Sequence, residues 1–174
     1  MSKDHILERI LDNRIIAVVR LDTSAQLLQV ARAIRAGGVE VIEFTMTTPD
    51  ALSMIEETGR TLGDDVLLGA GTVLDARTAR LAMAAGARFL VSPTLNRETI
   101  ETCHRFDVVA IPGALTPTEI FTAWEWGADL VKVFPARLGG PEYISDLLAP
   151  LPQLRLVPTG GVGPSNARQF IQAG

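Results

Sequence analysis

The chain has 174 residues, of which 47% are hydrophobic and 21% are charged. This is enough for one buried core, so we expect a single domain over residues 1–174 rather than two domains or a disordered chain. The formal net charge is −4, and the basic residues are scattered along the chain, which argues against a nucleic-acid partner. Residues 1–14 lack the uninterrupted apolar segment of a signal peptide, and no later segment is long enough to cross a bilayer. We therefore expect a cytoplasmic protein with no membrane partner.

Short apolar segments rich in β-branched residues alternate with longer segments of helical period along the whole chain. This alternation is typical of parallel strands joined by crossover helices. Most of the short segments are apolar on both faces, as in a parallel sheet that helices cover. The sequence predicts seven strands, at residues 15–20, 39–45, 66–71, 88–92, 107–111, 129–134 and 154–159.

The segments between these strands carry signals for helix ends. Helices are expected to begin near Asp22 or Thr23, Pro49, Asp75, Asn96, Thr116 with Pro117, Pro141, and Pro164. Gly38 (or Gly37), Gly86 and Gly127 each close a helical segment just before a strand, which predicts a left-handed backbone conformation at these glycines. The same kind of ending recurs in "FIQAG" at 170–174.

The repeating unit favours one fold class. Seven strand and helix units followed by one more helix ending fit an α/β protein of the (β/α)8 TIM-barrel type whose eighth strand is missing from this sequence. We accordingly expect the natural chain to be longer at its C-terminus. An open doubly wound sheet is the alternative, but that fold usually has a glycine-rich turn after its first strand, where this chain has "VVRLDTS" at 18–24.

Catalytic residues of such a barrel lie at the C-terminal ends of its strands. Here these ends carry Arg20, Glu43, Thr45, Gly71, Thr72, Ser92, Pro93, Pro112, Gly113, Lys132, Phe134, Thr159, Gly160 and Gly161. Lys132 and Glu43 are set among apolar strand residues, so burial should favour their neutral forms. A neutral amine can form a Schiff base with a ketone, and a carboxyl group of raised pKa can carry protons for the adjacent carbon. An inward Lys–Glu ion pair that only fills the barrel is the alternative.

Two glycines, Gly160 and Gly161, separate the last predicted strand from a helix expected to open at Pro164 or Ser165. Free backbone amides there would suit a phosphate group, although an ordinary tight turn is the alternative. The single cysteine, Cys103, is expected to be a packing residue within a helix. His5 and His104 have no other ligand residues at metal-binding spacing, so no metal site is indicated.

Six segments in order and spacing resemble the 2-keto-3-deoxy-6-phosphogluconate (KDPG) aldolases, which are close to the 4-hydroxy-2-oxoglutarate (KHG) aldolases. They are "GGVEVIEFTMTTPDA", "GAGTVLD", "GARFLVSP", "IPGALTPTE", "VKVFPA" and "VPTGGV". The resemblance covers the chain from about residue 14 to its end. It implies a class I aldolase in which Lys132 forms the Schiff base with the keto acid and Glu43 moves protons through a water. The implied substrate-binding residues are Arg20 and Thr72, the apolar wall of Pro93 and Phe134, and the phosphate end of Thr159, Gly160 and Gly161.

The resemblance also implies the reaction: reversible cleavage of KDPG to pyruvate and glyceraldehyde 3-phosphate, without a metal or an organic cofactor, in a homotrimer. One departure concerns Thr47, because some family members have an arginine there that grips the substrate carboxylate. Arg20 or neutral donors would have to replace it in this chain. The alternatives are a related keto-acid aldolase acting on 4-hydroxy-2-oxoglutarate or the galactonate epimer, a phosphosugar isomerase or synthase, and a non-catalytic or engineered barrel scaffold.

Overall fold

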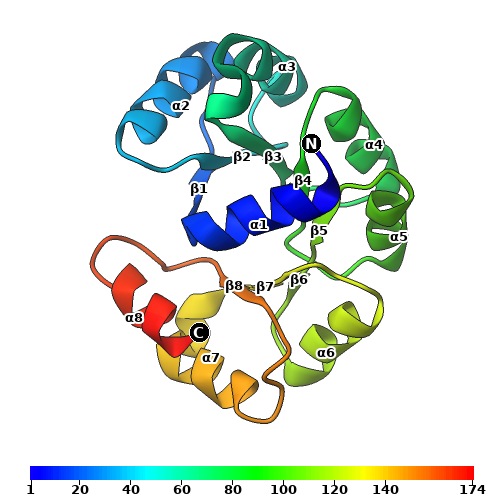
Figure 1. The fold of residues 1–174 in the computed structure, drawn as a ribbon, viewed down its shortest axis with the longest axis vertical. Coiled ribbons are helices and arrows are strands. Elements are labelled where there is room, and N and C mark those ends of the chain that lie inside the picture. Colours follow the sequence, from blue (N-terminus) through cyan, green and yellow to red (C-terminus); the bar gives the residue numbers. More distant parts are fainter.

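The computed structural model describes all residues 1–174 and places parallel strands around a centre with helices outside them (Figure 1). The strands of the first sheet are β1 (Ile16–Val19), β2 (Val41–Thr45), β3 (Leu67–Gly71), β4 (Phe89–Val91) and β5 (Val109–Ile111). The strands of the second sheet are β6 (Gly113–Ala114), β7 (Val131–Val133) and β8 (Leu156–Pro158). Every neighbouring pair is parallel and follows chain order. The predicted α/β barrel architecture is confirmed.

The segment around Pro112 joins the two sheets. The sequence predicted one strand at 107–111, whereas the structure has β5 before Pro112 and β6 after it, pairing with β4 and β7 respectively. A proline has no N–H for the ladder, but the Pro112 carbonyl still accepts a hydrogen bond from Lys132 N at 2.9 Å. At Gly113 a Cβ atom would lie 2.5 Å from the carbonyl carbon of Pro93. A glycine is therefore required where the chain passes from one sheet to the other.

The helices begin and end largely where the sequence signals place them. They are α1 (Lys3–Asn13), α2 (Leu27–Ala36), α3 (Ala51–Leu62), α4 (Ala76–Ala84), α5 (Arg97–Arg105), α6 (Pro117–Glu125), α7 (Gly140–Leu148) and α8 (Ala167–Ala173), with short 3-10 turns η1 (Ser24–Gln26), η2 (Gly63–Asp65) and η3 (Ala136–Leu138). Asp75 and Asn96 cap α4 and α5, and Thr116 forms a capping box on α6. Positive φ angles at Gly38 (91°), Gly86 (104°) and Gly127 (88°) confirm the predicted left-handed helix ends.

The last helix starts later than predicted. α8 begins at Ala167, not at Pro164 or Ser165. The reason is the side chain of Asn166, whose Nδ2 donates to Gly161 O and whose Oδ1 accepts from Gly163 N, both at 2.8 Å. These two bonds hold the preceding residues in a turn and delay the helix.

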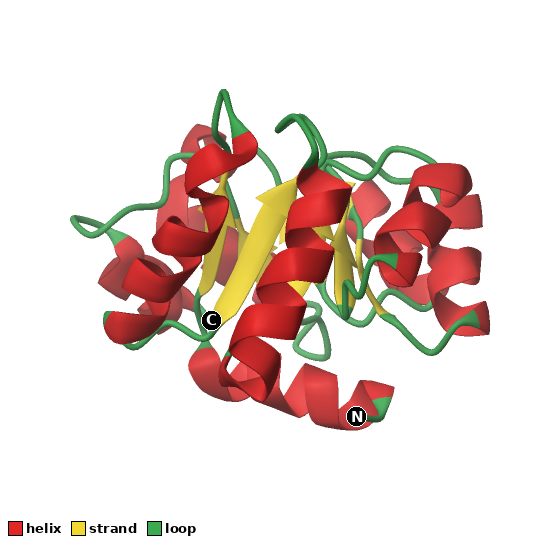
Figure 2. Ribbon diagram, turned by 90° about the horizontal axis from the view of Figure 1, so that it is seen from above, coloured by secondary structure: helices red, strands yellow, loops and turns green.

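Helix α1 covers the end of the barrel at which the strands begin, and the arrowheads of the strands point away from it (Figure 2). Ile6 and Ile10 of α1 are buried in one cluster with apolar residues from β2, β3, β4 and β5. Lys3 Nζ lies 2.9 Å from Asp129 Oδ1 and adds an ion pair at this end. The N-terminal end of the barrel is thereby closed by packing and charge together.

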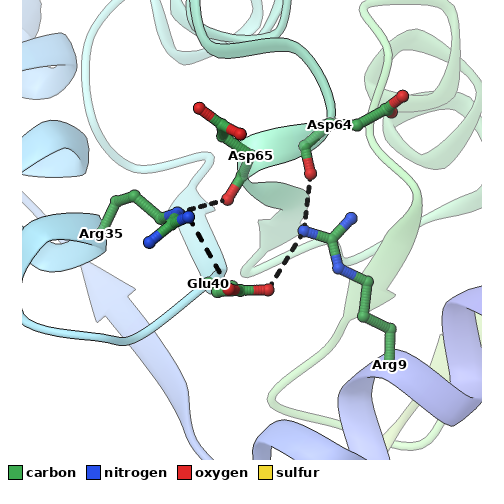
Figure 3. Close-up of polar contacts among 5 residues, drawn as sticks. All are labelled: Arg9, Arg35, Glu40, Asp64 and Asp65. Atoms are coloured by element: carbon green, nitrogen blue, oxygen red, sulfur yellow. Dashed lines mark hydrogen bonds and ion pairs between the residues drawn. The ribbon is translucent and has the colours of Figure 1, made fainter.

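A polar network at the N-terminal end ties α1 and α2 to the segments that enter β2 and β3 (Figure 3). Arg9 donates to the Asp64 carbonyl at 2.7 Å and to the Glu40 carboxylate at 3.4 Å. Arg35 Nε donates to the Asp65 carbonyl at 2.9 Å, and Arg35 Nη2 lies 3.9 Å from Glu40. Two arginines thus satisfy backbone carbonyls that a 3-10 turn leaves without partners.

The two sheets end at β1 and β8, and no ladder joins these two strands. Val18 in β1 is accordingly 47% exposed, whereas all five residues of β2 are buried. None of the helices is both long enough and apolar enough to pass through a bilayer.

Candidate active site

Lys132 lies at the centre of β7, between Gly113 of β6 and Val157 of β8. Its side chain is 6% exposed, and its Nζ lies 5.0 Å from the centroid of the Phe134 ring. Burial lowers the pKa of the Lys132 ammonium group, the Glu43 carboxylate opposes this shift, and Arg20 adds to it. The predicted bias toward the neutral amine is confirmed in direction.

Glu43 lies at the centre of β2 and is 3% exposed. Burial raises the pKa of its carboxyl group, and the charges of Lys132 and Arg20 oppose the rise. Gly71 at the end of β3 makes room for this side chain, since a Cβ atom on Gly71 would overlap the Glu43 carboxyl group. Gly71, the second glycine of "GAGTV", is therefore required because any larger residue would occupy the space of the Glu43 carboxyl group.

The charges of Lys132, Glu43 and Arg20 act on one another, so the structure brings the three predicted residues together at one end of the barrel. Lys132 and Glu43 do not form an ion pair within 4.0 Å, because the four salt bridges of the chain involve other residues. Neither side chain has a hydrogen-bond partner in the protein, and yet Thr58 Oγ1 is the only fully enclosed side-chain polar atom without one. The polar ends of Lys132 and Glu43 are therefore not fully enclosed, and the direct ion pair of the alternative interpretation is not formed.

Arg20 follows β1 and is exposed, and its Nη2 donates to Thr72 Oγ1 at 3.4 Å. The next residue, Leu21, donates its N–H to Thr48 Oγ1 at 3.2 Å, and Thr48 is 3% exposed. This backbone bond fixes the chain directly after the arginine. Sequence reasoning missed Thr48, because its partner is 27 residues away in the sequence.

The end of β2 carries a group of hydroxyls next to Glu43. Thr47 Oγ1 donates to Thr45 Oγ1 at 3.2 Å, and Thr45 Oγ1 lies 3.4 Å from Thr48 Oγ1. Thr47, the residue noted as a departure from the family pattern, is exposed at this edge. Arg20 is the arginine whose charge acts on the pKa of both Lys132 and Glu43, and the hydroxyls at the end of β2 offer only neutral donors.

The loop after β8 lies beside Phe134 and η3. Thr159 donates its N–H to Val133 O at 3.0 Å and accepts from Ala136 N at 2.7 Å. A Cβ atom on Gly160 would come 3.1 Å from the Phe134 ring, and both Gly160 and Gly161 have positive φ angles, 85° and 91°. Gly160 thus lies against the Phe134 ring, Thr159 is bonded to the backbone on both sides of it, and Gly161 lies against Arg137.

The N–H groups of Gly160, Gly161 and Val162 have no acceptor in the protein. Arg137 is the second residue that the sequence did not single out here, although it follows Lys132 by five positions. Pro93 is placed differently from the others: its backbone packs against Gly113, the residue paired with Lys132. It therefore adjoins the lysine strand through the backbone.

Outside this group, Cys103 is 1% exposed, and burial raises the pKa of its thiol to about 12, which agrees with the predicted packing role. His104 Nε2 lies 2.7 Å from Gly127 O, so this ring is engaged at the end of α6. No group of three or more histidine, cysteine and acidic side chains is placed to hold a metal ion.

Comparison with known proteins gives consistent results. The family described as KDPG and KHG aldolase matches residues 6–174. A 2-dehydro-3-deoxy-phosphogluconate aldolase of Treponema pallidum is 41% identical over 166 residues, covering 95% of this chain and 77% of the relative. A KDPG aldolase of Legionella pneumophila, solved with pyruvate captured as a covalent carbinolamine intermediate, has a TM-score of 0.84 and 32% identity, covering 90% of this chain and 76% of that one. A cube-shaped protein cage designed by fusing symmetric oligomeric domains has a TM-score of 0.87 and 34% identity, covering 91% of this chain and 59% of that one.

Proposed function

This chain belongs to the KDPG and KHG aldolase family, and from that premise we propose that it is a class I aldolase that cleaves KDPG into pyruvate and glyceraldehyde 3-phosphate. The observation that carries the proposal is Lys132, a buried lysine without an ionic partner whose pKa is affected by the charge of a second buried titratable group, Glu43. An amine of lowered pKa is the nucleophile that Schiff-base catalysis needs.

In the proposed mechanism the neutral Lys132 amine attacks the C2 ketone of the substrate. The carbinolamine so formed loses water and leaves a protonated imine on Nζ. The Phe134 ring, whose centroid is 5.0 Å from Nζ, presents a face that favours a cation, and this applies to the iminium ion as well as to the ammonium ion. The iminium ion then accepts electrons from the bond that breaks.

Glu43 moves the protons in this mechanism. In its ionised form it takes the proton from the C4 hydroxyl, directly or through one water, while the C3–C4 bond breaks and glyceraldehyde 3-phosphate leaves. The remaining enamine on Lys132 takes the proton back at C3, and hydrolysis of the imine releases pyruvate. Burial raises the pKa of the Glu43 carboxyl group above its ordinary value. A carboxyl group of raised pKa can both accept a proton and return it, as these two steps require.

The substrate's two ends are proposed to lie on opposite sides of this pair. Arg20 and Thr72, joined at 3.4 Å, are proposed to bind the carboxylate next to the ketone, with the β2 hydroxyls as neutral donors. Thr159, Gly160 and Gly161 are proposed to receive the phosphate, and Pro93 and Phe134 to form the apolar wall. The N–H groups of Gly160 and Gly161, which have no acceptor in the protein, support this placement of the phosphate.

We further propose that the protein assembles as a homotrimer. The similarity to a cage built from symmetric oligomeric domains supports an oligomer, and apolar side chains such as Leu138 (68% exposed) and Leu74 (52% exposed) are available on the surface. Light scattering coupled to size exclusion measures the mass directly, and a monomeric mass at micromolar concentration would contradict this assembly.

Trapping with pyruvate and borohydride tests the proposed function. The chain has only two lysines, Lys3 and Lys132, so Lys3 is an internal control within the same protein. Peptide mass spectrometry is expected to find the reduced pyruvate adduct on Lys132 and not on Lys3. A folded sample with no adduct on Lys132 would refute class I aldolase chemistry. Cleavage rates for KDPG, its galactonate epimer and 4-hydroxy-2-oxoglutarate then identify the substrate among the related keto acids.

A further inference from the structure

The loop proposed to receive the phosphate has donors but no charge of its own. The N–H groups of Gly160, Gly161 and Val162 are free of protein acceptors, which suits an anion. However, α8 has only 7 residues and begins at Ala167, several residues beyond the loop. A single short helix placed there cannot supply the positive end of a dipole to a ligand at Gly160, because the effect falls off within the first turn. A dianion at this place needs a cation from elsewhere.

Arg137 is the cationic residue that lies against this loop. Its N–H donates to Gly160 O at 2.9 Å, and a Cβ atom on Gly161 would come 2.7 Å from the Arg137 Cβ. The neighbouring bond from Ala136 N to Thr159 O, at 2.7 Å, fixes η3 to the same loop. The root of the arginine side chain is therefore held in van der Waals contact with the glycine pair, while the residue itself is exposed.

The guanidinium group of Arg137 is also uncommitted. It takes part in none of the four salt bridges and in no side-chain hydrogen bond of the protein, whereas Arg9 and Arg35 are both held by Glu40 and by carbonyls. Guanidinium binds phosphate through paired N–H donors and stays charged at any working pH. A free arginine beside unbonded backbone amides is the combination that recognises a phosphoryl group.

We propose that Arg137 is a specificity-determining residue: its guanidinium group binds the phosphoryl group of the substrate together with the Gly160–Val162 amides, and so sets the preference for phosphorylated over unphosphorylated keto acids. This inference rests on the proposed aldolase function. It predicts that the charge at residue 137 affects the phosphorylated substrate alone, because the unphosphorylated one carries nothing for the arginine to bind.

The test compares cleavage of KDPG with cleavage of unphosphorylated 2-keto-3-deoxygluconate in the Arg137→Gln, Arg137→Lys and Arg137→Glu variants. Arg137→Gln should lower kcat/KM for KDPG about tenfold, the size expected for one charge-assisted hydrogen-bonding group, and leave the unphosphorylated substrate within about twofold. Arg137→Lys should keep most of the preference, and Arg137→Glu should lose more than Arg137→Gln. Arg155→Gln is the matched control, because Arg155 is exposed and precedes β8 at the opposite end of the strand, and it should change neither rate.

Borohydride trapping with pyruvate separates the two hypotheses, since pyruvate has no phosphate. Trapping at the wild-type rate in Arg137→Gln, together with a lost preference for KDPG, supports the assignment. Normal trapping with an unchanged ratio of the two kcat/KM values overturns the role of Arg137 and leaves the aldolase intact. Absence of a Lys132 adduct in the wild-type protein overturns the aldolase function itself.

Discussion

The two lysines of this chain lie at opposite ends of the barrel and in opposite circumstances. Lys3, on the helix that covers the N-terminal end, is 2.9 Å from the Asp129 carboxylate. Lys132, which points to the C-terminal end, is more deeply buried and has neither an ion pair nor a hydrogen bond. A buried charge without a partner is costly. The arrangement of Lys132 therefore points to function, whereas the ion pair of Lys3 contributes to stability.

The arginines show the same division. Arg9 and Arg35 are bound to Glu40 and to backbone carbonyls at the N-terminal end (Figure 3). Arg20 and Arg137, at the C-terminal end, take part in no salt bridge. Charges at one end join structural elements, whereas these two arginines at the other end have no ionic partner, which agrees with the proposed ligand site at the C-terminal ends of the strands.

Lys132→Met should produce the largest effect. Loss of the nucleophile should lower kcat at least ~1000-fold and abolish the pyruvate adduct. The same variant should be more stable than the wild type at pH 7. Burial lowers the pKa of Lys132, so below the ordinary pKa of 10.5 folding requires either loss of a proton or burial of a charge, and methionine removes that cost.

Urea denaturation between pH 6 and pH 10 measures this linkage. The stability difference should be greatest at low pH and shrink as the pH rises toward 10.5, the ordinary pKa of lysine. A difference that is constant across the range would show that the folded protein does not perturb this amine. Lys3→Met is the control, since removal of a paired lysine should lower stability and leave activity unchanged.

Gly71→Ala should have the second-largest effect, because the new methyl group would overlap the Glu43 carboxyl group. Displacement of the proton carrier by about 1 Å is expected to lower kcat about 100-fold, and the overlap should cost about 1–3 kcal/mol of stability. Gly59→Ala in α3 is the matched control, since its Cβ would meet Leu68 at an ordinary 3.8 Å. That variant should be stabilised by about 0.5–1 kcal/mol with full activity.

The double variant Glu43→Ala/Gly71→Ala separates the steric effect from a general loss of folding. Removal of the carboxyl group should restore stability and leave the enzyme inactive. If stability is not recovered in the double variant, the overlap at Gly71 is not the cause of the defect.

Thr48→Val tests the support of Arg20 and should have a moderate effect. The isosteric change removes the acceptor for Leu21 N, so we expect about a fivefold higher KM for KDPG, a kcat within about twofold, and a stability loss of about 1 kcal/mol. Thr48→Ser should behave as the wild type. In an Arg20→Ala background Thr48→Val should leave KM unchanged; an equal rise in KM with and without Arg20 would assign Thr48 a purely structural role.

The sequence predicted what local chemistry determines. Helix ends at Gly86 and Gly127 follow from the freedom of glycine at positive φ, and the perturbed state of Lys132 and Glu43 follows from their apolar strand neighbours. It failed where contacts between distant segments decide. Asn166 delays α8 by bonding to Gly161 and Gly163, which no helix-start signal reveals.

The junction at Pro112 and the position of Arg137 teach the same lesson. A proline after an apolar strand predicts the end of that strand. Only the pairing of Gly113 and Ala114 with β7 shows that the chain continues as a strand of the second sheet. Arg137 acquires its place through a bond to Gly160 across two neighbouring strand ends. The burial of Lys132 and Glu43, the proposed catalytic pair, was therefore predictable from the strands themselves, and the contacts that place Thr48 and Arg137 beside the strand ends were not.

Arg9→Ala should have the smallest effect and should act on stability alone. The variant removes the bond to the Asp64 carbonyl at 2.7 Å and the contact with Glu40 at 3.4 Å, which is expected to cost about 1 kcal/mol. Glu101→Gln is its control, because the Arg97–Glu101 pair is exposed within one helix turn and should contribute no more than about 0.5 kcal/mol. Denaturant midpoints and kcat/KM are measured on the same preparations. The Arg9 network lies at the end of the barrel that α1 covers, and the proposed active site lies at the other end. The values of kcat/KM and the rate of pyruvate trapping should therefore stay at those of the wild type. A loss of kcat/KM as large as that of Thr48→Val would show that the two ends are coupled, and it would contradict the division between structural and ligand-binding charges.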